Sequence, residues 1–113
     1  MLKIILDLDG KETEITQPYV KGISNRKALA LAERTELGEL SPSEQQELVV
    51  ANLADAFNDE RVTTDTLQNV LNYPAMGYDT FTEAIVTLNQ NLLVGGVIKK
   101  KTKNLTVTET LEE

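Results

Sequence analysis

The sequence predicts an α+β domain in which an N-terminal β-hairpin precedes three to four packed amphipathic α-helices. Two observations predict this class: an alternating apolar segment with an Asp-Gly turn opens the chain, and apolar residues then recur at helical spacing. The length of 113 residues suits one small domain. We expect this domain to span residues 1–96 and a flexible or weakly structured tail to span residues 97–113.

The first expected element is a hairpin over residues 1–17, with Asp9-Gly10 as its turn. A type I′ turn needs positive φ at both central positions, which Asp-Gly accepts. Side chains alternate along a strand, so one face collects a row of apolar residues. These residues are Leu2, Ile4, Leu6, Leu8 and Ile15. Because a two-stranded ribbon is only marginally stable alone, this face must pack on the helices or on another chain.

The next two elements are helices with recognisable ends. Ser24 is the expected N-cap of a first helix that continues to about Leu37. Gly38 then suits the position just after the helix. The stretch Ser41-Pro42-Ser43-Glu44 has the capping-box arrangement, and it predicts a second helix that continues to about Phe57.

Two shorter helices are expected in the second half of the chain. Thr64 is the expected cap of the first, and Asp79 or Thr80 begins the last, which continues to about Val94. Beyond this point the helical period is lost, and a basic run occupies residues 99–103. We interpret that run as part of a solvated tail.

The composition disfavours an enzyme. Cysteine and histidine are absent, and this removes the commonest nucleophile, base and transition-metal ligands. We therefore predict no catalytic residue, no cofactor and no metal site. The net charge of -7 opposes binding to nucleic acid or to anionic membranes. No apolar run reaches the roughly 18 residues needed to cross a bilayer, so no membrane span is expected.

One motif suggests a different chemistry. The segment Leu6-Asp7-Leu8-Asp9-Gly10 resembles the opening motif of haloacid-dehalogenase-type phosphatases, in which the first aspartate attacks phosphorus beside Mg²⁺. However, Lys11 stands where that family usually has a small Thr or Val, and the chain is too short for the doubly wound sheet of that family. We favour a hairpin turn and keep a metal-dependent phosphatase-like fragment as the least favoured alternative.

Aromatic residues gather around Pro74 and Gly77. Tyr73, Tyr78 and Phe81 could anchor a partner, since aromatics are frequent binding hot spots, or they could close a corner between two helices. With the apolar hairpin face, they complete the set of candidate partner-binding residues. That set is Leu2, Ile4, Leu6, Leu8, Tyr73, Tyr78 and Phe81.

The order of elements resembles that of the tail assembly chaperones of long-tailed bacteriophages, especially those of Gram-positive hosts. The resembling features are the strand–Asp-Gly–strand opening over 4–15, the segment 19–29 leading into a helix, an acidic helix ending at Phe57, the helix start 62–67, and a final helix closing in 94–96. The resemblance covers about residues 1–96.

This resemblance implies a role similar to that of the lambda tail chaperone. Such proteins act in the cytoplasm of the bacterial host, bind the long, hydrophobic tape-measure protein and keep it soluble. They help to recruit tail-tube subunits and leave before the tail is complete. The free edges of a two-stranded ribbon also suggest self-association. A small acidic adaptor that binds a host or phage protein is the alternative from another class.

Truncation after Gly96 is expected to leave the fold intact, because it removes few apolar residues at helical spacing. Helical circular dichroism and the melting temperature should both survive the truncation. Unfolding of the truncated chain would place Leu105 and Val107 in the core and contradict the predicted domain boundary.

Overall fold

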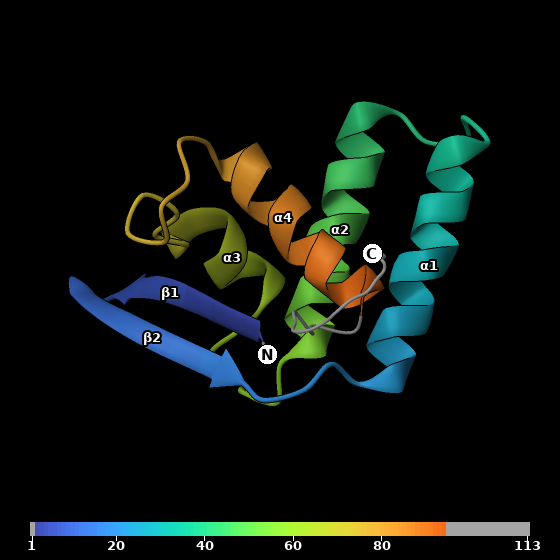
Figure 1. The fold of residues 1–113 in the computed structure, drawn as a ribbon. Coiled ribbons are helices and arrows are strands. Elements are labelled where there is room, and N and C mark those ends of the chain that lie inside the picture. Colours follow the sequence, from blue (N-terminus) through green and yellow to red (C-terminus); the bar gives the residue numbers. More distant parts are fainter. Residues whose placement is uncertain (1, 95–113) are drawn as a thin grey trace.

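The computed structural model describes residues 2–94 and confirms the α+β class, with a hairpin followed by four helices (Figure 1). The elements are β1 (Leu2–Leu8), β2 (Lys11–Gln17), α1 (Gly22–Glu36), α2 (Pro42–Ala56), α3 (Thr64–Val70) and α4 (Phe81–Leu93). In Figure 1, α1 and α2 stand side by side, α3 lies next to the hairpin, and α4 crosses obliquely in front of α2. The expected tail over 97–113, with its basic run at 99–103, lies outside the described residues.

The hairpin has the predicted register. β1 and β2 are antiparallel, with Leu8 opposite Lys11 and Ile4 opposite Ile15. Asp9 and Gly10 have φ values of 53° and 78°, as a type I′ turn requires. This agreement confirms that Asp9-Gly10 forms a turn between the two strands.

The hairpin is also attached to the segment that follows α3. Leu6 forms an isolated antiparallel bridge with Leu71, and the backbone N–H of Asn72 donates to the carbonyl of Ile5 at 2.8 Å. These contacts cover part of the outer edge of β1. Within residues 2–94, the outer edge of β2 is paired with no other strand.

The core lies between the hairpin and the helices. Leu2, Ile4 and Leu6 are completely buried, and Ile15 is buried beside them. The helices and the segments between them contribute the other buried apolar side chains, with Leu53, Leu67, Leu88 and Leu92 among the most deeply buried. The apolar face of the hairpin therefore packs on the helices of its own chain, one of the two alternatives predicted from the sequence.

Two helix starts differ from the predicted ones. The N-cap of α1 is Lys21 rather than Ser24, which lies inside the first turn and is buried. Ser24 and Ala28 are one turn apart and both face the core, so the backbone must already be helical at Ser24. The N-cap of α3 is Thr63 rather than Thr64, because the Thr63 hydroxyl accepts from the N–H of Thr66.

The remaining helix ends agree with the prediction. Ser41 caps α2 in a reciprocal capping box: its hydroxyl accepts from the N–H of Glu44, and the Glu44 carboxylate accepts from the N–H of Ser41. The hydrogen bond from the N–H of Ser41 to the carboxylate lowers the pKa of Glu44, and the nearby Ser41 hydroxyl adds to this effect, since both favour the charged form. Thr80 caps α4 through the N–H of Glu83. Gly38 follows the C-cap of α1 with a φ of 73°.

Replacement of Gly10 by valine is expected to lower the free energy of unfolding by roughly 1–3 kcal/mol, because a β-branched residue is strained at positive φ. A Cβ at this position meets no atom within 4 Å, so strain rather than a clash is the cause. Chemical denaturation measures the effect. Gly22→Val is the matched control, since Gly22 has equal space but no positive φ. Equal midpoints for the two variants would contradict the assigned turn.

Candidate functional site

The hairpin residues of the candidate set face inward. Leu2, Ile4 and Leu6 are completely buried, and Leu8 is half-buried at the turn end. A partner would reach the first three only if the hairpin left the helices. A partner of the folded domain must therefore contact other apolar surfaces.

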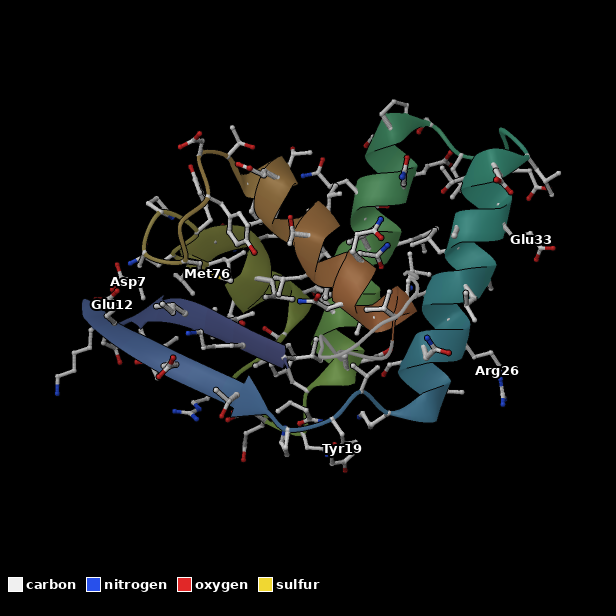
Figure 2. All side chains as sticks on the ribbon, viewed as in Figure 1. Asp7, Glu12, Tyr19, Arg26, Glu33 and Met76 are labelled. Atoms are coloured by element: carbon white, nitrogen blue, oxygen red, sulfur yellow. The ribbon has the colours of Figure 1, made fainter. Side chains whose placement is uncertain are left out.

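The aromatic residues lie on the segment between α3 and α4. The backbone N–H groups of Met76 and Tyr78 both donate to the carbonyl of Tyr73, and Gly77 turns the chain with a φ of 94°. Tyr73, Tyr78 and Phe81 are half-buried and pack against the core. Figure 2 shows Met76 above the hairpin, within this segment.

The structure does not bring these aromatic residues into one hollow. Tyr78 and Met76 line a hollow of about 250 Å³ beside β1, together with Lys3 and Ile5. Phe81 lines a separate hollow of about 210 Å³ with residues of α2 and with Gln68 of α3. The aromatic cluster predicted from the sequence is therefore divided between two small depressions.

A larger groove lies between α1 and α4, above the first half of α2, and we call it the α1–α4 groove. Its volume is about 770 Å³. Its lining residues are Arg26, Leu29, Ala30, Leu31, Ala32, Glu33, Thr35 and Glu36 of α1, Gln45 and Val49 of α2, and Asn89, Gln90 and Leu93 of α4. Sequence reasoning missed this site, since its residues come from three helices and form no motif.

Asn25 joins the start of α1 to the end of α4. Its side-chain Nδ2 donates to the carbonyls of Leu92 and Leu93, at 2.7 and 3.0 Å. These carbonyls are among those that a helix C-terminus leaves without a partner, so Asn25 caps α4 from the first turns of α1. The two helices meet at this point, and α4 then crosses α2 obliquely while α1 continues alongside it (Figure 1).

The groove combines apolar walls with a charged rim. Leu29 is 52% exposed, Leu93 is half-buried, and buried Val49 contributes to the floor. Arg26 and Glu33 are among the lining residues, and Figure 2 shows their side chains on the outer side of α1, pointing away from α4. This combination is typical of a protein-binding surface rather than of a site for chemistry.

The described residues offer no preformed ion site. Within residues 2–94, no three acidic side chains gather in a way that could hold a metal ion. Asp7 is exposed and lies opposite Glu12 near the hairpin turn, as Figure 2 shows.

None of the helices within residues 2–94 has the length and apolar character to cross a membrane.

Comparison with known families decides the identity of the chain. The family model described as phage tail chaperone protein matches residues 1–106. The chain belongs to this family of phage tail chaperones. A search of curated proteins and a search of solved structures both gave no significant match. The family assignment confirms the resemblance found in the sequence.

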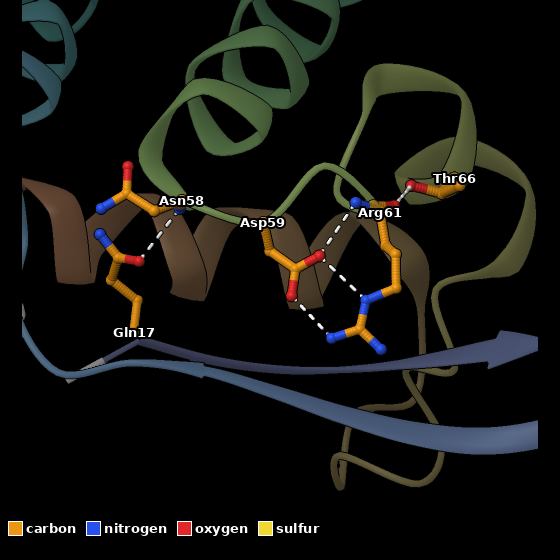
Figure 3. Close-up of polar contacts among 5 residues, drawn as sticks. All are labelled: Gln17, Asn58, Asp59, Arg61 and Thr66. Atoms are coloured by element: carbon orange, nitrogen blue, oxygen red, sulfur yellow. Dashed lines mark hydrogen bonds and ion pairs between the residues drawn. The ribbon is translucent and has the colours of Figure 1, made fainter.

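A polar network fixes the loop between α2 and α3 of this tail chaperone (Figure 3). The side-chain carbonyl of buried Gln17 accepts from the N–H of Asn58. The Asp59 carboxylate accepts from the N–H, Nε and Nη2 of Arg61, at 2.7–2.9 Å. The hydroxyl of Thr66 donates to the carbonyl of Arg61 at 2.8 Å. The network joins the end of β2 to the start of α3.

Arg61 also shifts the titration of Asp59. The side-chain and backbone hydrogen bonds from Arg61 lower the pKa of the Asp59 carboxyl to about 2. A lowered pKa in the folded state means that this pair stabilises the fold above the ordinary carboxyl pKa. The contribution is lost as the pH falls from about 4 to about 2.

Asp59→Asn is expected to lower the free energy of unfolding of the tail chaperone by roughly 1 kcal/mol near neutral pH, the upper range for a partly exposed ion pair. The difference from wild type should shrink as the pH falls from about 4 to about 2, and it should vanish below that, where the carboxyl is protonated in both the folded and the unfolded state. Urea denaturation across this pH range measures both effects. Asp55→Asn breaks the more exposed pair with Lys27 and serves as the control. A difference independent of pH would show that the Asp59 charge does not contribute.

Proposed function

We propose that this tail chaperone binds the tape-measure protein of its phage and keeps that long, apolar chain soluble. It helps to recruit tail-tube subunits around the complex, and it is not retained in the virion. It acts in the cytoplasm of the bacterial host, without catalysis and without a cofactor or metal ion.

Family membership over residues 1–106 is the observation that carries this proposal. The resemblance found in the sequence implies the same client, because tail assembly chaperones bind the tape-measure protein. A small acidic adaptor is less favoured, since the matched family is defined by tail assembly.

The physical properties of the chain support the same role. A net charge of -7 keeps the chaperone soluble, which a protein needs if it is to hold an apolar client in solution. The folded domain also retains exposed apolar side chains after its core is complete, among them Tyr19, Ile23, Leu29 and Val86. Such side chains can contact an apolar client without unfolding the domain.

Co-expression with the cognate tape-measure protein is expected to move the client from the insoluble to the soluble fraction, because the chaperone covers its apolar segments. The two proteins should also purify together. The measurement is the soluble fraction of the client with and without the chaperone.

Leu53→Asp is the control variant for this experiment. It places a charge at a completely buried position and should abolish folding and client rescue together. A client that is equally insoluble with and without the wild-type chaperone, and that does not co-purify, would reject the chaperone proposal in favour of the adaptor.

A further inference from the structure

We propose that the α1–α4 groove binds one amphipathic helix of the client, with the basic end of that helix beside Glu33 and Glu36. The inference rests on the proposed function for the source of this helix. It adds the surface of the chaperone that is used and the chemistry of the client segment.

The shape of the groove suits a helix. Along α1, its lining extends from Arg26 to Glu36, about three helical turns or roughly 15 Å. α1 and α4 form the two walls, and α2 forms the floor. Ala30 and Ala32 contribute little bulk to the α1 wall, so a client backbone can come close. An amphipathic helix that lays its apolar face into such a groove is a recurring mode of recognition.

The apolar contacts define one face of the client helix. Leu29 on α1 and Leu93 on α4 line opposite walls and retain exposed surface within the domain. A helix between these walls contacts them with side chains spaced three and four residues apart. The client segment should therefore have apolar residues at i, i+3, i+4 and i+7.

The rim charges define the orientation of the client helix. Arg26 lies near the start of α1, whereas Glu33 and Glu36 lie near its end. Within residues 2–94, none of these three side chains forms an ion pair. A client helix with Lys or Arg beside the two glutamates and an acidic residue beside Arg26 complements this pattern.

One residue that lines the groove, Asn89, carries a buried acceptor. The side-chain oxygen Oδ1 of Asn89 is buried, and it has no hydrogen-bond partner among the described residues. A buried acceptor without a donor is unfavourable. Rotation of the Asn89 side chain toward the groove would let a Lys, Arg or amide donor on the client helix satisfy this oxygen.

Peptide binding to the full-length chaperone tests the inference. The probes are overlapping fluorescent peptides of about 20 residues, or roughly 30 Å of helix, that together cover the cognate tape-measure protein. Fluorescence anisotropy measures their affinity. We expect at least one peptide with the described apolar face and basic end to bind the wild type.

Two groove variants are compared with two matched controls. Leu29→Glu places a charge on the α1 wall, and Leu37→Glu makes the same change at a leucine that is 68% exposed and outside the groove. Glu33→Lys with Glu36→Lys reverses the rim, and Glu47→Lys with Glu60→Lys makes the same change in net charge at other exposed positions. The groove variants should bind at least about tenfold more weakly, and the controls within about twofold of wild type. Circular dichroism verifies that all four variants fold.

The outcomes separate this inference from the proposed function. If the wild type keeps the client soluble but the groove variants bind peptides as well as it does, the groove is not the site and the chaperone role stands. The same conclusion follows if the client is rescued but no peptide binds. If Leu29→Glu dissociates a wild-type oligomer in light scattering, a second copy fills the groove and the inference is wrong. Failure of the wild type to rescue the client instead rejects the proposed function.

Discussion

The apolar face of the hairpin is the feature on which the rest of the structure depends. A two-stranded sheet cannot protect such a face from water, and it is marginal in isolation. In this chaperone the helices cover the face so completely that Leu2, Ile4 and Leu6 have no exposed surface. The segment after α3 adds backbone contacts along the outer edge of β1. Removal of this cover would expose the apolar face of the hairpin to water.

The position of α4 follows from this requirement and leads to the groove. α4 buries Ile85, Leu88 and Leu92 in the common core and ends against α1, where Asn25 caps it. The helix therefore crosses α2 obliquely instead of packing along α1 for its whole length (Figure 1). The space that remains between α1 and α4 is a by-product of core packing. Its lining combines apolar walls with a charged rim.

Local features of the fold could be predicted from the sequence. The Asp9-Gly10 turn and the Ser41 capping box depend on interactions within a few residues, so their residue types indicate the structure directly. Ser24 shows the limit of such signals. It has the chemistry of an N-cap, but burial on the same helix face as Ala28 places it inside α1. Core packing determined the helix start here, and a capping preference of about 1 kcal/mol did not prevail.

The candidate site was much less predictable. Leu2, Ile4 and Leu6, three of the hairpin residues predicted to contact a partner, are completely buried in the folded domain, and a row of apolar side chains in a sequence does not reveal what covers it. The groove depends on the inclination of α4 relative to α1, which is fixed by contacts such as the one between Asn25 and Leu92, 67 positions apart. No short motif encodes an angle between two helices.

The contact between Asn25 and the end of α4 also has a consequence for the order of folding. Chains emerge from the ribosome from the N-terminus, and contacts between residues distant in sequence form late because a long loop must close. The hairpin and α1 are available early, whereas the carbonyls of Leu92 and Leu93 are among the last groups of the described fold to be synthesised. Both walls of the groove therefore exist only after translation has passed residue 93. The groove is therefore a property of the completed domain and is absent from any shorter nascent chain.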